Sequence, residues 1–393
     1  MSDKSVPLQF PGLLKSPRQI RIAIAGFFFI SGFGFSSWAS RIPTLQQHLR
    51  LNEAQLGAVL LAMPLGLILT LPLTGLLIAR FSSRNMMLFG AILLNLILVV
   101  LGLVDQTWQL AVLLFCFGAS RNQLSISVNA QSIGVQSLYS KSILNTFHGI
   151  WSVAGFAGAA FGSLMISISI PPAYHFTLVC LLLTGLALIL FPASLPEPEN
   201  RQATRTGFVL PDRSLMKFGL MSFSSMACEG TLYDWSGIYF QKVVQAPKEF
   251  TAAGFVVFMV AMTAGRFSGD YVVNRFGRKA VLSTSGALMS AGLLLAALWP
   301  TVLTAGLGFM MVGLGVSCVV PLVIAIAGQS ATLGNTGSVI AAVSTIAYAG
   351  FLIVPPVVGF LAEALNLQWS FGLMSLLGLG LMALVSRVNP PAG

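Results

Sequence analysis

Two carboxyl groups stand inside one apolar segment of the chain, at Glu229 and Asp234 within residues 228–235. At about 1.5 Å per residue, a helix between Lys217 and Lys242 is long enough to cross a hydrocarbon core of about 30 Å. Glu229 is therefore predicted near the centre of a membrane, where a charge costs about 2.5 to 3.5 kcal/mol and marks a functional site by default. The alternative for either acid is a structural role, as a neutral group or as the partner of a buried cation.

The chemistry that suits Glu229 is reversible proton binding. Loss of water around a carboxyl group favours its neutral form, and a neutral Glu229 is free to move between helix packings. Asp234 lies about 140° further around the helix, so the two acids do not share a face. His148 could relay protons because histidine changes charge near neutral pH, and its alternative is a packing role. The predicted proton-coupling residues are Glu229, Asp234 and His148.

Residues 121–131 are too polar for a helix that faces lipid. Asparagine and glutamine both donate and accept hydrogen bonds, which suits a hydroxyl-rich solute. Arg121 suits a carboxylate, or it could pair with Glu229. Trp151 offers an apolar face to a sugar-like ring or packs between helices, and polar packing is the alternative for part of the run. The predicted substrate-binding residues are Trp38, Arg121, Asn122, Gln123, Asn129, Gln131, Trp151, Tyr233 and Trp235.

The elements that carry these residues are predicted to be membrane-spanning helices. Hydrophobic residues make up 56% of the chain and charged residues 8%, where a soluble domain has about 25% charged residues. Apolar runs of about 20 residues recur along the whole length, as in a multi-spanning membrane protein. Twelve spans are predicted, near residues 20–40, 53–79, 86–104, 108–134, 142–169, 173–191, 215–241, 250–273, 280–299, 301–327, 336–362 and 369–386.

The charge distribution gives the predicted orientation. The net charge is +10, but most lysines and arginines fall in short loops on one side of the spans, so the charge points to membrane topology and not to nucleic acid. The positive-inside rule makes that side the cytoplasm, with both termini inside. We predict a cytoplasmic N-terminal segment (1–19), a six-helix bundle (20–191), a cytoplasmic linker (192–213), a second six-helix bundle (214–387) and a tail (388–393).

The two halves repeat. Trp38 and Gly57 recur as Trp235 and Gly254 at one common offset. The basic turn 80–84 recurs as 275–279, and Gly155-Phe156 recurs as Gly350-Phe351, both at an offset two residues shorter. Six predicted spans separate the members of each pair, so the repeat is parallel, as in two bundles related by an axis along the membrane normal.

An enzyme is disfavoured by what the chain lacks. The four cysteines, Cys116, Cys180, Cys228 and Cys318, lie in apolar runs and have no metal-site or disulfide spacing. The three histidines, His48, His148 and His175, are scattered, and neither a nucleophile with its base nor a phosphate-binding glycine loop is present. We therefore expect no catalytic residues, no metal and no cofactor. The first apolar run is too long for a cleavable signal and is predicted to remain as a span.

At its basic turns the chain resembles the major facilitator superfamily of transporters. That family has a loop signature Gly-x-x-x-Asp-Arg-x-Gly-Arg-Lys after its second helix and again after its eighth. The first copy is degenerate here, with Gly75, Ala79 in place of the acid, Arg80 and Arg84. The second is closer, with the residues Gly265, Arg266, Gly269, Asp270, Asn274, Arg275, Gly277, Arg278 and Lys279.

A closer resemblance is to a bacterial branch of MosC-like membrane proteins, distantly similar to fucose permeases. It is carried by residues 38–43, 129–131, 147–152 and 229–235. In that branch acids often flank the fourth-helix asparagine, and here those places are Ser125 and Gln136. Glu229 and Asp234 are then the main intramembrane carboxylates.

The resemblance implies proton-coupled alternating access for a sugar, a polyol or an amino-polyol. Spans one and seven meet across the central axis of that fold, so Arg41 is expected to pair with Asp234 and close the outer side, or else to cap a helix or bind lipid headgroups. The expected gating residues are Arg41, Arg80, Arg84, Arg266, Asp270, Arg275 and Arg278.

The rival function is proton-coupled efflux of drugs or metabolites. Its signature in span five usually includes a Gly-Pro pair, which residues 158–162 lack. We expect a monomer in a bacterial inner membrane whose partners are a small-molecule substrate, protons and the lipid bilayer.

Overall fold

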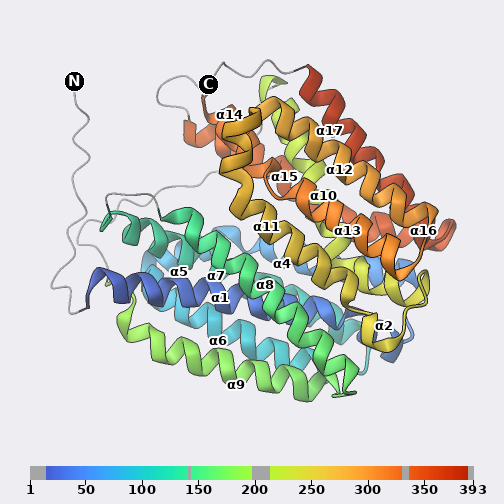
Figure 1. Cartoon of the computed structure of the whole chain (residues 1–393). Coiled ribbons are helices and arrows are strands. Elements are labelled where there is room, and N and C mark those ends of the chain that lie inside the picture. The colour runs from blue at the N-terminus through green and yellow to red at the C-terminus, as the bar shows by residue number, and fades with distance from the viewer. Residues whose placement is uncertain (1–14, 140–142, 197–212, 330–335, 388–393) are drawn as a thin grey trace. The chain divides into compact units, whose positions relative to one another are not determined.

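The computed structural model describes residues 15–139, 143–196, 213–329 and 336–387, and in these ranges it contains helices and connecting loops (Figure 1). Most of the predicted linker (197–212), most of the N-terminal segment (1–14) and the C-terminal tail (388–393) lie outside the described residues. By packing, the chain divides into two compact units. Unit 1 comprises Met1–Trp38, Ala62–Gly158 and Pro171–Arg205, and unit 2 comprises Ala39–Leu61, Ala159–Ile170 and Thr206–Gly393.

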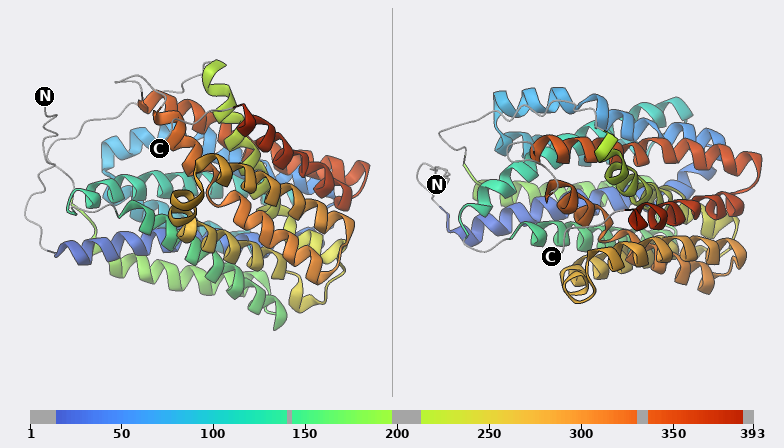
Figure 2. Two further views of the ribbon diagram at one scale, coloured as in Figure 1. Left: turned by 45° about the horizontal axis from the view of Figure 1, so that its top comes forward. Right: turned by 90° about the horizontal axis from the view of Figure 1, so that it is seen from above.

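Unit 1 is built from long apolar helices. Within it α6 and α9 run side by side (Figures 1 and 2). Two helices, α1 and α8, begin in unit 1 and end in unit 2. The elements are α1 (Pro17–Ser40), α4 (Ala62–Leu69), α5 (Leu71–Phe81), α6 (Ser83–Leu101), α7 (Thr107–Gln136), α8 (Leu144–Ser167), α9 (Pro172–Leu190) and η1 (Phe191–Ala193).

Unit 2 joins two segments of the predicted first half, 39–61 and 159–170, to the helices of the second half. Its elements are α2 (Ile42–His48), α3 (Glu53–Leu60), α10 (Arg213–Lys242), η2 (Lys248–Phe250), α11 (Ala253–Phe276), α12 (Arg278–Leu298), α13 (Val302–Val316), α14 (Val319–Gln329), α15 (Thr336–Ala364), α16 (Leu367–Met374) and α17 (Leu376–Ser386). The units group residues by packing, and the predicted division into two six-helix bundles stays a prediction.

Ten helices of the described residues are long and apolar enough to cross a membrane, and an eleventh span arises if the bent pair Glu53–Leu69 and Leu71–Phe81 is counted as one. The helix α10 has 30 residues, enough to span by length, but it is more polar because it carries both acids and several serines. Twelve spans and cytoplasmic termini stay predictions.

Three predicted spans are broken. Residues 53–79 form α3, α4 and α5, with a bend of 44° before Leu71. Proline at the start of α5 lacks the N–H that would continue the preceding turn. The last predicted span divides into α16 and α17, and residues 301–327 divide into α13 and α14 around Ser317 and Cys318.

The two basic turns have the same backbone conformation. Ser82, between α5 and α6, has φ 79° and ψ 148°, and Gly277, between α11 and α12, has φ 81° and ψ 154°. Positive φ is costly for residues with a Cβ atom but not for glycine. Gly277 therefore suits its turn, whereas Ser82 adopts a conformation that is unfavourable for serine. The Ser82 hydroxyl accepts a hydrogen bond from the Asn85 N–H (3.1 Å) and so caps α6.

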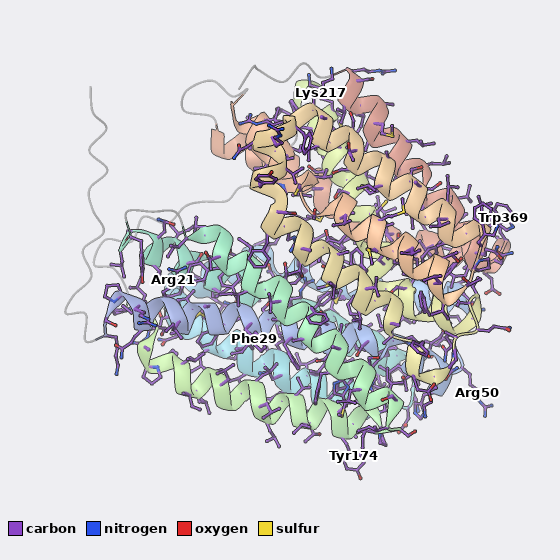
Figure 3. All side chains as sticks on the ribbon, in the orientation of Figure 1. Arg21, Phe29, Arg50, Tyr174, Lys217 and Trp369 are labelled. Carbon is purple, nitrogen blue, oxygen red and sulfur yellow. The ribbon has the colours of Figure 1, made fainter. Side chains whose placement is uncertain are left out.

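The side chains that cover the helices are largely apolar. Tyr174 and Trp369, at the ends of their helices, project outward and are 72% and 55% exposed (Figure 3). Apolar exposure of this kind is unusual for a protein surrounded by water and fits helices surrounded by lipid, with aromatic residues near the ends of the spans.

Candidate functional site

The carboxylate of Glu229 is buried in unit 2 with two polar partners. Tyr233, one turn later on α10, donates its hydroxyl to Glu229 Oε1 at 2.8 Å. Arg266 of α11 places Nη2 3.6 Å from the same oxygen, and the side chains of Arg266 and Glu229 are 28% and 8% exposed. A buried carboxylate needs such partners because its charge would otherwise be costly. The cluster of Glu229, Tyr233 and Arg266 is called the carboxylate cluster below.

Aromatic rings hold Tyr233 from three sides. Its ring is stacked on Phe351 of α15, with an interplanar angle of 18° and centroids 6.2 Å apart. Phe255 and Phe258 of α11 meet it edge-on, at centroid distances of 5.9 and 5.6 Å. The hydroxyl therefore has a defined position from which to bind Glu229, since an aromatic side chain has few rotatable bonds and these contacts fix them.

Asp234 and Arg41 are both buried in unit 2, with 8% and 2% exposed. Arg41 donates Nη2 to the carbonyl oxygen of Ile170 at 2.8 Å, which ties the junction of α1 and α2 to the end of α8. Burial lowers the pKa of Arg41 to about 10, so the guanidinium remains cationic at neutral pH. The predicted ion pair between Arg41 and Asp234 stays a prediction.

Residues of the predicted first half pack against α10 and η2 at the Lys242 end of α10. Lys242 Nζ lies 2.6 Å from Glu53 Oε1 at the start of α3. Lys248 donates to the Ser169 hydroxyl at 2.7 Å. A Cβ atom on Gly237 would lie 2.7 Å from the Pro43 ring of α2. The positive-inside rule predicts that this end faces outward, and its contacts are called the outer closure below.

The backbones of α3 and α15 cross closely at Gly57 and Gly359, where a Cβ atom on Gly57 would meet the carbonyl oxygen of Pro355. A Cβ atom on Gly359 of α15 would lie 2.5 Å from the carbonyl oxygen of Glu53 and 3.0 Å from Gly57 Cα. Backbone meets backbone here, so neither position has room for a larger residue. Small residues allow helices in a membrane to approach this closely.

The polar residues of α7 hold unit 1 together. Asn122 donates to the Thr74 hydroxyl at 3.0 Å and Gln131 to the Ser83 hydroxyl at 2.9 Å. Gln123 donates to Ser127 at 3.2 Å, and Asn129 donates to the carbonyl oxygen of Ser125 at 2.8 Å. Each of these four predicted substrate-binding residues therefore donates at least one side-chain hydrogen bond to another group of unit 1.

An aromatic ring covers the guanidinium of Arg121. Its Cζ lies 4.1 Å from the centroid of Phe35, and Phe35 is stacked with Trp151 at 6.5 Å. Trp38 is buried against Phe117. One face of the guanidinium is therefore covered, which orients its N–H edge toward other groups. Trp235 is fully buried in unit 2.

The other predicted residues lie at helix ends. His148 is exposed, edge-on to Phe28 at 5.4 Å. Arg80 is exposed above Phe81, whereas Arg84 donates to the Ser194 hydroxyl at 2.9 Å and to the Phe191 carbonyl at 3.3 Å. Arg275 is exposed, Arg278 is half-buried, and the side chain of Asp270 lies outside the described residues.

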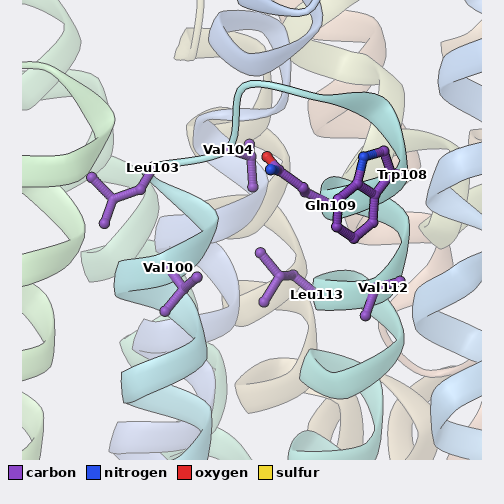
Figure 4. A pocket seen from close by; sticks show the side chains of 7 residues that line it. All are labelled: Val100, Leu103, Val104, Trp108, Gln109, Val112 and Leu113. Carbon is purple, nitrogen blue, oxygen red and sulfur yellow. The ribbon is translucent and has the colours of Figure 1, made fainter.

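A groove of about 320 Å³ lies between α6 and α7 (Figure 4). Its lining is mostly apolar, and none of the predicted site residues contributes to it. The lining residues are Val100, Leu103, Val104, Trp108, Gln109, Val112 and Leu113.

Comparisons with known proteins place the chain in a family. The sequence model of the Major Facilitator Superfamily matches residues 24–273 and 248–393. The chain belongs to the major facilitator superfamily. The predicted fold class, an all-α membrane protein with this fold, is thereby confirmed, and the protein is a multi-pass membrane transporter and not an enzyme.

Individual major facilitator proteins agree with the resemblance to the MosC-like branch. An uncharacterized transporter of Yersinia pestis is 33% identical over 365 residues, which are 92% of this chain and 94% of that protein. Membrane protein MosC of Rhizobium meliloti is 31% identical over 348 residues, 88% of this chain and 84% of MosC. A crystal structure of the E. coli fucose:proton symporter has a TM-score of 0.62 and 17% identity, covering 94% and 98% of the two chains.

Two contacts of this transporter were not predicted from the sequence. Arg266 was expected in the gate, and the structure places it on Glu229. The ion pair of Lys242 and Glu53 was not anticipated. The cation at one end of a predicted span and the acid at the start of another were visible signals, but opposite charges at span ends do not reveal which spans meet.

Proposed function

We propose that this protein is a proton-coupled secondary transporter that moves a small polar solute across a bacterial inner membrane by alternating access. The observation that carries the proposal is the carboxylate cluster. Glu229 lies near the middle of α10, buried, with Arg266 and Tyr233 on one of its oxygens. An ionisable residue within a membrane span is a functional site by default, and a carboxylate is the group that most readily takes up a proton there.

In the proposed cycle, charged Glu229 is held by Arg266 and Tyr233. Proton binding neutralises the carboxylate, which weakens the ion pair and the charge-assisted hydrogen bond. Arg266, whose side chain is partly exposed, then turns toward other groups, including the solute. Return of Arg266 to Glu229 favours release of the proton. Proton binding to Glu229 and the packing of α10 against α11 each affect the other, and this mutual dependence couples proton binding to the conformational change.

The solute is proposed to be a sugar, a polyol or an amino-polyol. Hydroxyl groups suit the carboxamides of α7, which both donate and accept hydrogen bonds, and ring carbons suit the aromatic residues Trp151 and Phe35. The fucose:proton symporter has the same fold, which supports this solute class and proton coupling. We propose that the protein acts as a monomer.

Transport by purified protein in proteoliposomes tests the proposal. Uptake of candidate sugars, polyols and amino-polyols is compared with and without an inward proton gradient, and accumulation is expected only with the gradient. Glu229→Gln should abolish accumulation but retain exchange of solute across the membrane. The matched control is Glu363→Gln, at an exposed carboxylate of α15, which should accumulate solute normally. Full accumulation by Glu229→Gln would remove Glu229 from the coupling role.

A further inference from the structure

The helix α15 touches both the carboxylate cluster and the outer closure. Phe351 is stacked on Tyr233, and Gly359 lies against Gly57 and Glu53. The two contacts are separated by eight residues, or about 12 Å along the helix axis. One helix therefore connects the proton-binding group with the glycine crossing of the outer closure.

Between these two contacts α15 has a weak point. Pro355 and Pro356 stand inside the helix. Proline has no N–H, so the carbonyl groups of Phe351 and Leu352 lose the hydrogen bond from four residues later. Helices kink at such positions. Phe351, one of these two residues, also carries the ring that is stacked on Tyr233.

Neighbouring residues brace this weak point against α10. A Cβ atom on Gly230 would lie 3.0 Å from Phe351 Cδ1, so the ring sits directly over the α10 backbone. Tyr233 in turn is fixed by its hydrogen bond to Glu229 and by the two edge-on rings of α11. The position of the Phe351 ring thus depends on the position of Tyr233, and that depends on Glu229.

We infer that the Tyr233–Phe351 stack couples the protonation of Glu229 to the outer closure, with Phe351 as a positioning residue. This inference rests on the proton-binding role proposed above for Glu229. When Glu229 takes up a proton, the hydrogen bond from the Tyr233 hydroxyl loses its charge assistance and weakens, so the Tyr233 ring is held less firmly against Phe351. Phe351 then no longer braces the proline-weakened turn, α15 bends there, and Gly359 separates from Gly57.

Ionisable residues other than Glu229 occur in α10 and in the helices packed against it, and a change of pH acts on them too. Its own groups include Lys217, Cys228, Tyr233, Asp234, Tyr239 and Lys242. The sequences of three helices packed against it contain further ionisable residues: Arg266, Asp270, Tyr271 and Arg275 in α11, Tyr348 and Glu363 in α15, and His48 in α2. The sequences of α13, α14, α16 and α17 contain no ionisable side chain. Glu229 is the carboxylate of this set that hydrogen-bonds to the stacked tyrosine.

A distance measurement across the crossing tests the coupling. Spin labels are attached at Ala58→Cys on α3 and Ala364→Cys on α15, both exposed positions, in full-length protein with the native cysteines replaced by alanine. Distances are measured by pulsed electron resonance in liposomes at about pH 8 and about pH 5.5, on either side of the neutral range. The parent protein should show a longer distance at the lower pH.

Two ring variants separate the stack from general damage. Phe351→Leu removes the stacked ring, and Tyr233→Phe keeps the ring but removes the hydroxyl that binds Glu229. Each is expected to lose more than half of the pH-dependent change. Phe360→Leu, the same substitution at an exposed position of α15, should retain it.

The coupling is overturned if both ring variants keep the full change, or if the parent distance is the same at both pH values. Failure of the proposed function would be a different result, namely uptake that ignores the proton gradient in parent proteoliposomes. The two failures are read from separate measurements and cannot be confused.

Discussion

Lys242 at the end of α10 and Glu53 at the start of α3 form an ion pair of 2.6 Å, although they belong to different predicted halves of the chain. The pair joins the first half of the transporter to the second at the end predicted to face outward. Its side chains are 37% and 20% exposed, so it contributes about 1 kcal/mol or less.

Reversing one charge of this pair should favour the outward-open state modestly. Glu53→Lys or Lys242→Glu alone is expected to change the transport rate about fivefold or less, because like charges then meet at a partly solvated site. The double charge swap should return the rate toward that of the parent. Rates of solute exchange in proteoliposomes measure this, and a double variant no better than the worse single variant would show that the pair is not a closing contact.

Gly359→Ala should prevent α15 from approaching α3. The added Cβ atom would meet the Glu53 carbonyl and Gly57 Cα, which are backbone atoms that cannot rotate away. We expect transport to fall by more than tenfold because the outer closure no longer forms, a loss of about 1.4 kcal/mol or more. The control is Gly380→Ala in α17, where a Cβ atom meets nothing within 4 Å. Equal activity of the two variants would contradict the role of the glycine crossing.

Both basic turns should be more stable with glycine than with a residue that has a Cβ atom, because both have positive φ. Gly277→Ala places a Cβ atom at φ 81° with open space around it, so its cost of about 1 to 2 kcal/mol is purely conformational. Ser82→Gly relieves the same conformation and loses only a helix cap, which costs a few tenths of a kcal/mol when glycine replaces serine, so it should stabilise the protein. Thermal unfolding in detergent compares them with Gly306→Ala, a mid-helix change in open space that should be stabilising. Lower stability of Ser82→Gly would argue against strain at this turn.

A charge swap tests the predicted pair of Arg41 and Asp234. Both side chains are buried, and an unpaired buried charge costs about 3 to 5 kcal/mol. Arg41→Asp or Asp234→Arg alone should reduce transport at least about tenfold. The swap should recover part of the activity, and only part, because Arg41 also donates to the Ile170 carbonyl. Absence of any recovery would leave Arg41 with a role in holding the end of α8.

The sequence by itself determined where the apolar segments lie and that Glu229 stands in the middle of one of them, because hydropathy and the cost of a charge in hydrocarbon are properties of one segment at a time. The apolar runs, the loop charges and Glu229 in the middle of its span could be recognised from composition and position alone. The repeat was visible too, and Ser82 and Gly277 share one backbone conformation at positions that correspond in the two halves.

Only the tertiary structure decided which side chains meet. The pairing of Glu229 with Arg266, the stack of Tyr233 on Phe351 and the crossing of Gly57 with Gly359 depend on the rotation of each helix and on which helices are neighbours. Most membrane spans are apolar on nearly every face, so the hydrophobic period that fixes helix rotation in soluble proteins carries little information. The polarity of α7 was visible in the sequence, yet the hydrogen bonds of Asn122 with Thr74 and of Gln131 with Ser83 could be assigned only once the neighbouring helices were in place.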